Sequence, residues 1–170
     1  VFFVPAMTFS GGKYGVGILS REEPISVRRV PLPGREEPRV LLIAEFRDFI
    51  VASTHFSLTE ADRITSAEIL IAEVRHIEEA RQIDKPVFIA GDLNAQPESA
   101  TIRLLEQHFT LLSDKSAHTF PANNPDRCID YIFGKFPTHH KFRITQKRVV
   151  PEAMASDHRP VMVELVLEAR

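Results

Sequence analysis

The chain has little of several features that would define its class. It contains a single cysteine, Cys128, so no disulfide can form within the chain, and its redox compartment stays open. Its apolar stretches are too short to span a bilayer and no signal-like segment opens it, so we expect a soluble chain without a targeting signal. No charge of one sign dominates. The formal net charge is -2 with acids and bases mixed, which weakens the case for binding a long nucleic acid.

The remaining composition is that of a folded domain. With 170 residues, 44% of them apolar, the chain can bury one sizeable core, and we treat residues 1–170 as a single domain. It begins at Val1 inside an apolar, strand-like run and without an initiator methionine. We therefore expect that residues upstream of this point have been lost or omitted.

Strand and helix patterns alternate along the sequence. Residues rich in Val, Ile, Leu and Phe predict strands over 14–20, 25–30, 40–46 and 49–53, and the last two meet at a short Arg47-Asp48 turn, as in a hairpin. Apolar residues recur at a spacing of three to four from Ile64 to Ile77, which predicts one long amphipathic helix that starts after Thr59 and ends before Pro86. The remaining expectations are a buried strand over 87–90, a helix over about 99–109, strands over 128–133 and 161–167, and loops over 31–38 and 119–127.

Residues suited to phosphate chemistry follow or precede these strands. Gly91 opens a loop that carries Asp92 and Asn94, and Asp157 and His158 lie close to the C-terminus. Hard oxygen ligands hold Mg²⁺ and an imidazole can move a proton, which are the requirements of a metal-assisted attack on a phosphate ester. These residues predict a hydrolase of phosphate esters.

Four short motifs resemble the endonuclease/exonuclease/phosphatase superfamily in their order and approximate spacing. They are Thr54-His55, Gly91-Asp92-Leu93-Asn94, Ile129-Asp130-Tyr131-Ile132 and Ser156-Asp157-His158-Arg159-Pro160-Val161, and the stretch from Tyr14 to Arg21 resembles the family strand upstream of the hairpin. The resemblance covers almost the whole chain. It implies a four-layer α/β sandwich of the deoxyribonuclease I type, with two mixed sheets face to face and helices outside. It also implies an enzyme that depends on Mg²⁺ or Mn²⁺.

The resemblance assigns roles residue by residue. Asp92 would orient or deprotonate the attacking water, and Asn94 would help to place that water and the phosphate. His158 would contact the scissile phosphate while Asp130 holds its imidazole, and His55 would bind the phosphate from the other side. The metal ligands would be Asp92, Asn94 and Asp157.

Other candidates compete with ordinary structural roles. Tyr14, Arg39 and Arg127 are candidates for substrate binding. An aromatic residue at a strand start is more often part of a core, however, and a solvated surface role is the better interpretation for Arg35, Arg39 and Arg127.

The sequence departs from the family pattern at its N-terminus. Family members carry upstream a strand that ends in Asn and a glutamate that is a principal metal ligand, and neither segment is present in this chain. We therefore expect an N-terminally truncated domain whose exposed apolar edge favours self-association. An alternative is a non-catalytic or impaired phosphate-binding module of the same fold. For an enzyme, a small or soluble phosphate ester is the preferred substrate, and an extended nucleic acid is not favoured.

Overall fold

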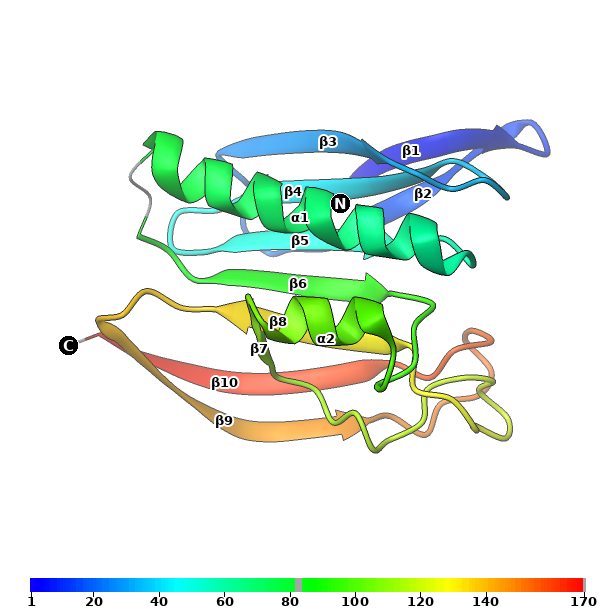
Figure 1. Ribbon diagram of the computed structural model, residues 1–170. Coiled ribbons are helices and arrows are strands. Elements are labelled where there is room, and N and C mark those ends of the chain that lie inside the picture. The colour runs from blue at the N-terminus through cyan, green and yellow to red at the C-terminus, as the bar shows by residue number, and fades with distance from the viewer. Residues whose placement is uncertain (82–83, 170) are drawn as a thin grey trace.

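The computed structural model describes residues 1–81 and 84–169. Its secondary structure is predominantly β, with two helices among the described residues (Figure 1). The elements in chain order are β1 (Phe2–Phe9), β2 (Gly12–Ile18), β3 (Ser26–Leu32), β4 (Arg39–Glu45), β5 (Ile50–His55), α1 (Glu60–Arg81), β6 (Val87–Asp92), α2 (Ala100–Glu106), β7 (Thr110–Leu111), β8 (Asp130–Lys135), β9 (His140–Val149) and β10 (Val161–Ala169).

A six-stranded mixed sheet forms the centre, in the order β3-β4-β5-β6-β8-β7. Strands β5 and β6 are parallel and are connected through α1, whereas the other neighbouring pairs are antiparallel. Parallel neighbours need a long crossover, and a helix packed on one face of the sheet supplies it. The crossover has a consequence for the site, because β5 and β6 end at the same edge of the sheet.

Strand β4 shows why both faces of this sheet are covered. Leu41 and Ile43 belong to the apolar cluster that includes Leu70 and Val74 of α1. The alternate residues of β4, among them Leu42, pack in a second cluster with residues of the β1-β2 hairpin. Successive side chains of a strand point to opposite faces, so a continuously apolar strand must be buried on both.

Two hairpins form the layer behind the central sheet. Strands β1 and β2 pair with each other and pack against β4, whereas β9 and β10 pair with each other and β10 contacts β8. Both helices lie on the opposite face of the central sheet (Figure 1). The described residues thus supply one helical layer and two β-layers of the expected sandwich.

Most predicted elements are present, and the differences have physical causes. Strand β9 was not predicted, because charged residues interrupt its few apolar positions and it is an exposed edge strand. The two-residue strand β7 was not predicted either, and the expected loop over 31–38 is wrong at Pro31 and Leu32, which end β3. The helix after Ser99 ends at Glu106, and part of the segment between α1 and Pro86 lies outside the described residues.

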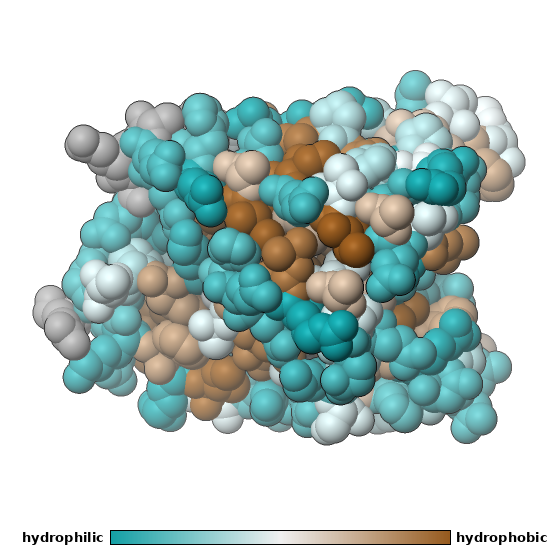
Figure 2. Space-filling model, in the orientation of Figure 1, coloured by the Kyte–Doolittle hydropathy of each residue, from teal (hydrophilic) through white to brown (hydrophobic). Residues whose placement is uncertain are grey.

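The face that carries both helices is mostly hydrophilic, with apolar residues visible in its middle (Figure 2). Among residues 1–81 and 84–169, neither helix has the length and hydropathy needed to cross a membrane.

Candidate active site

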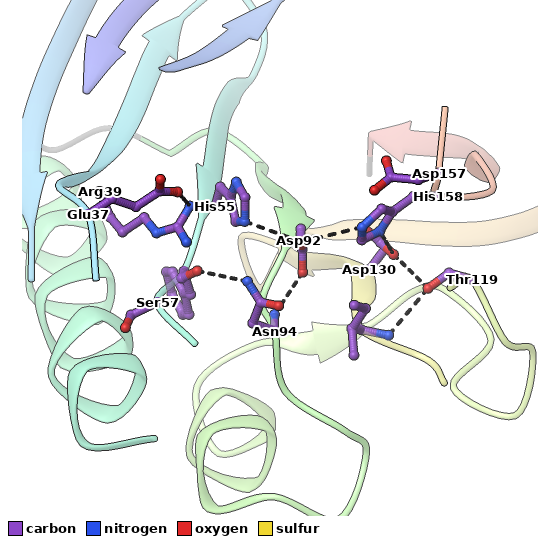
Figure 3. Close-up of polar contacts among 12 residues, drawn as sticks. Glu37, Arg39, His55, Ser57, Asp92, Asn94, Thr119, Asp130, Asp157 and His158 are labelled. Carbon is purple, nitrogen blue, oxygen red and sulfur yellow. Dashed lines mark hydrogen bonds and ion pairs between the residues drawn. The ribbon is translucent and has the colours of Figure 1, made fainter. Parts of the chain in front are cut away.

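Three neighbouring strands bring polar side chains to one edge of the central sheet. His55 ends β5, Asp92 ends β6 and Asp130 begins β8. The register pairs His55 with Asp92 and Asp92 with Asp130. Residues opposite one another on adjacent strands have neighbouring side chains, so motifs far apart in sequence meet here. Figure 3 shows Asp92 between the two others.

Asp92 is the centre of this group. Its Oδ2 lies 3.3 Å from Nε2 of His55 and 3.9 Å from Nε2 of His158. Its Oδ1 accepts a hydrogen bond of 2.8 Å from the backbone N–H of Asn94. Burial, together with the nearby charge of Asp130, raises the pKa of Asp92 to about 6, although the Asn94 N–H acts in the opposite direction. Asp92 is therefore a partly buried carboxylate between two imidazoles.

His158 is held from its other ring nitrogen. Its Nδ1 lies 2.9 Å from Oδ2 of Asp130, and Oγ1 of Thr119 donates a hydrogen bond of 2.6 Å to the same oxygen. The backbone N–H of Ile129 donates to Thr119 at 3.3 Å. Burial alone would lower the pKa of His158, but its hydrogen bond with Asp130 and the surrounding carboxylate charges raise it. The imidazole thus directs Nε2 towards Asp92 (Figure 3).

The end of β6 places Asp92 through a close backbone approach to β5, and the expected loop starts later than Gly91, because Gly91 and Asp92 still pair with β5. Gly91 has a φ of 157°, and a Cβ at this position would lie 1.9 Å from the carbonyl oxygen of Thr54. Asn94 adopts a left-handed φ of 48°, which asparagine tolerates, and its Nδ2 donates to the Phe56 carbonyl at 3.0 Å. A glycine before the aspartate is thus required by packing.

His55 is held in its neutral form. Burial is the main cause that lowers its pKa to about 4, and the positive charges of Arg39 and His158 act in the same direction. The Tyr14 hydroxyl lies 3.3 Å from Nδ1. If this hydroxyl donates, the opposite nitrogen carries the proton and faces Asp92, which matches the 3.3 Å contact to that carboxylate.

Arg39 departs from the expected surface role. Its side chain is only 4% exposed, and its Nη1 lies 2.7 Å from Oε1 of Glu37. Its Nε is buried and has no hydrogen-bond partner among the described residues. Arg39 lines a cavity of about 10 Å³ together with Tyr14 and His55, which has room for about one water molecule but not for a phosphate. The surface interpretation of Arg39 is wrong.

The other two arginines lie at the surface. The Arg127 guanidinium lies 4.6 Å from the centre of the Phe120 ring, and that ring lies 4.6 Å from the His158 ring. Arg127 therefore reaches the rim of the site through an aromatic contact. Arg35 instead makes a two-pronged contact with Asp62 in the first turn of α1, away from the motif residues.

A metal-binding geometry overlaps with this arrangement. Within the described part of the chain, one group of potential ligands stands out: Asp92, Asp130 and His158 offer atoms within 4.8 Å of one another. Asp130 and His158 are already hydrogen-bonded to each other, whereas Oδ2 of Asp92 has only the looser contacts with the two imidazoles, at 3.3 and 3.9 Å. Asp157 is exposed and lies beside His158 (Figure 3). Asp92 is a partly buried carboxylate beside a second carboxylate and a neutral imidazole, and this arrangement fits a divalent cation, since burial of an unbalanced negative charge is costly.

Two residues of the site were missed in the sequence. Thr119 orients Asp130, and Phe120 packs against His158. Both lie in a segment expected to be a loop, and no local pattern marks a loop threonine as the partner of a carboxylate eleven positions away. Only the approach of this loop to the start of β8 reveals them.

Beside these residues lies a cavity of about 330 Å³. Its lining includes Asp92, Asp130 and His158, together with Arg159 and Val161 near the start of β10. This volume admits a phosphate and part of the group attached to it.

Solved structures with the same fold include proteins of several names. A mannosyl-6-phosphatase from Bacteroides thetaiotaomicron matches with a TM-score of 0.69 and 18% identity, over 85% of this chain and 67% of that one. The human Nocturnin catalytic domain with a bound sulfate matches with a TM-score of 0.64 and 16% identity, over 86% and 60% of the two chains. A truncated TDP2 from Caenorhabditis elegans matches with a TM-score of 0.57 and 17% identity, over 82% and 64%. These likenesses confirm the expected fold.

The chain spans about two thirds or less of the length of these structures, and other endonuclease/exonuclease/phosphatase structures from Bacteroides species are covered over 63% and 66%. No curated protein sequence matches the chain. A model of the endonuclease/exonuclease/phosphatase family matches residues 3–158, which include the first three motifs, the first three residues of the fourth, and the side chains of His55, Asp92, Asp130 and His158. The chain therefore belongs to the endonuclease/exonuclease/phosphatase family.

Proposed function

We propose that this chain carries the catalytic residues of a divalent-metal-dependent phosphoesterase, in which water attacks phosphorus in line. The observation that carries the proposal is the row His55, Asp92, His158 and Asp130, in which a carboxylate lies between two imidazoles and the outer imidazole is oriented by a second carboxylate. Hydrolysis of a phosphate ester needs a group that orients water and donors that stabilise charge on the phosphoryl oxygens.

In this proposal Asp92 orients the water and accepts its proton. Oδ1 accepts the Asn94 N–H, and Oδ2 lies between the two imidazoles, where the water would be held. A pKa near 6 leaves the carboxylate largely ionised at neutral pH while it remains basic enough to accept a proton. Asn94 helps to place the water and the phosphate through its side-chain amide.

The two histidines act from opposite sides. Asp130 accepts the Nδ1 proton of His158, so Nε2 is free to contact a phosphoryl oxygen, and the raised pKa favours the charged form. His55 stays neutral, because its pKa is near 4, and it offers one N–H towards the same centre. The charged imidazole of His158 and the neutral imidazole of His55 would thus both bind and stabilise the phosphate, from opposite sides.

The residues that would hold Mg²⁺ or Mn²⁺ are Asp92, Asn94 and Asp157. When bound, the ion supplies positive charge to a phosphoryl oxygen and lowers the pKa of water. Asp130 and His158 are better assigned to the hydrogen-bonded pair, because each already satisfies the other.

For the substrate we propose a small or soluble phosphate ester, with Tyr14 and Arg127 at the rim of its site. The mixed charge of the chain favours such a ligand over an extended nucleic acid. The name of one structural neighbour, a mannosyl-6-phosphatase, supports a small phosphate ester, as does the sulfate bound by another.

The test is hydrolysis of bis-p-nitrophenyl phosphate with Mg²⁺ or Mn²⁺ by the wild-type chain, Asp92→Asn and His158→Gln. Asp48→Asn is the matched control, since this carboxylate is exposed and lies in the turn between β4 and β5, at the end of β5 away from His55. We expect metal-dependent turnover that falls at least about 100-fold in the two site variants and is unchanged in the control. Metal-dependent turnover that survives Asp92→Asn would remove Asp92 from the mechanism.

Calorimetric titration of Mn²⁺ provides a readout that does not depend on turnover. We expect weaker Mn²⁺ binding by Asp92→Asn than by the wild type and by Asp48→Asn. Equal binding by all three proteins would contradict the assignment of Asp92 as a ligand. Phosphate binding without any turnover would favour the alternative of a non-catalytic module.

A further inference from the structure

The turn between β1 and β2 carries two aromatic rings to the rim of the proposed active site. Phe9 is 62% exposed and Tyr14 is 37% exposed. The ring centroids of Phe9 and Tyr14 are 6.5 Å apart, and those of Tyr14 and His55 are 6.4 Å apart. Two successive ring contacts therefore connect the exposed Phe9 with the imidazole beside Asp92. In Figure 1 the turn projects from the end of the molecule at which β5 and β6 finish.

The backbone holds Phe9 in place at the end of its strand. Phe9 pairs with Gly12, so only Ser10 and Gly11 form the loop, and their φ values are 47° and 78°. Two residues with positive φ are the signature of a tight type I′ turn, which matches the twist of the paired strands. The aromatic ring is thus presented by a short, defined turn.

Packing does not explain the position of Phe9. The apolar cluster beneath this hairpin includes Val4 and Ile18, whereas Phe9 lies outside the buried clusters of the described residues. Its described ring contact is with Tyr14, its diagonal neighbour across the hairpin. An exposed ring that reaches His55 through one further ring is suited to bind the outer part of a ligand held beside Asp92.

We propose that Phe9, together with Tyr14, is a stacking platform for the nucleobase of a nucleotide-type phosphate ester. The inference rests on the proposed function, because it takes the phosphate to lie beside Asp92 and His158. A ring bonded directly to the phosphate would meet Tyr14 first. A ring held a sugar's length away would reach one ring further out, to Phe9. The geometry therefore favours a nucleotide over a sugar phosphate or a phenyl ester.

The test compares ligands that differ by one part. Adenosine 5′-monophosphate carries both base and phosphate, ribose 5-phosphate lacks the base, and adenosine lacks the phosphate. Binding to the wild type is measured by calorimetry. Because the chain contains no tryptophan, Phe9→Trp also places a single fluorescent reporter at the platform, and a stacked base is expected to quench it.

We expect the wild type to bind adenosine 5′-monophosphate about tenfold more tightly than ribose 5-phosphate, the gain typical of one base stacked on an aromatic side chain. Phe9→Ala and Phe9→Leu should reduce this ratio to about one, whereas Phe9→Trp should keep it. Phe3→Ala is the matched control, since Phe3 lies on the same strand and is 48% exposed. This control should retain the tenfold preference.

Equal affinity of the wild type for the two phosphates, or a preference that survives Phe9→Ala, would overturn the proposal. If phenyl phosphate bound more tightly than ribose 5-phosphate by the same factor as adenosine 5′-monophosphate does, and if this factor depended on Phe9, the assignment to a nucleobase would be overturned. Failure of the proposed function has a different signature. In that case adenosine would bind as tightly as its monophosphate, and His158→Gln would change neither affinity, while the dependence on Phe9 would still report stacking.

Discussion

The close approach of β5 and β6 at Gly91 makes Gly91→Ala a sharp test of how the site is built. A methyl group at this position would lie 1.9 Å from the Thr54 carbonyl oxygen and 2.9 Å from its carbon. Both atoms are backbone, so no side chain can rotate away. The strands would have to part by at least about 1 Å, because carbon and oxygen atoms do not pack closer than about 3 Å. The φ of 157° adds strain for any residue with a Cβ.

The cost can be worked from the contacts that flank Gly91. The Phe56 N–H donates to the Asp92 carbonyl at 2.9 Å, and the Leu93 N–H donates to the Ile129 carbonyl at 2.8 Å. Weakening two such bonds costs about 2 kcal/mol, and backbone strain adds about 1 to 3 kcal/mol. We expect the free energy of unfolding to fall by about 3 to 5 kcal/mol, which lowers Tm by about 10 °C or more in a chain of this size.

The assay is urea unfolding followed by circular dichroism, with phosphate binding measured on the folded fraction. Gly12→Ala is the control, because the nearest atom to its new methyl group is the Phe9 carbonyl oxygen at an ordinary 3.6 Å. The control should lose less than about 1 kcal/mol. If Gly91→Ala were as stable as the control, the explanation that Gly91 is required by the close packing of β5 and β6 would be refuted. Weaker phosphate binding by folded Gly91→Ala is also expected, since Asp92 would move relative to His55.

Three further predictions concern groups around the site. The pKa of His55 falls from 6.5 in the unfolded chain to about 4 in the folded chain, so the unfolded state binds more protons between these values and the contribution of His55 to stability falls by about 2 kcal/mol as pH drops from 6.5 to 4. In urea unfolding at pH 7 and 4.5, the stability of His55→Gln should therefore depend less on pH than that of the wild type. Equal pH dependence of the two proteins would contradict the lowered pKa of His55. Tyr131→Phe should destabilise the chain by about 2 kcal/mol in the same assay, because the buried hydroxyl donates towards the carbonyl oxygens of Ala95 and Cys128, each 2.8 Å away. A change below about 0.5 kcal/mol would show that these carbonyls find other partners. Thr119→Val should lower kcat about tenfold by releasing Asp130, and Thr119→Ser should restore it; equal rates in both variants would remove the hydroxyl from the orientation of His158.

Much of the fold was predictable because it depends on local periodicity. The apolar run over 40–46 predicted the strand β4, and the three-to-four spacing from Ile64 to Ile77 predicted α1. Strand β9 escaped prediction, because an edge strand exposes most of its residues and carries charges at positions that a buried strand would make apolar.

The sequence by itself determined the family and marked the residues to which we assign the chemistry, since short motifs such as Gly91-Asp92-Leu93-Asn94 combine a glycine that permits a close backbone approach with polar side chains at neighbouring positions. Only the tertiary structure decided how these residues meet. Asp130 and His158 are 28 positions apart, and their contact depends on the order and register of the strands. Only the tertiary structure revealed that Arg39 is buried. The exposure of a long charged side chain depends on the elements packed around it, and a local sequence pattern does not identify those elements.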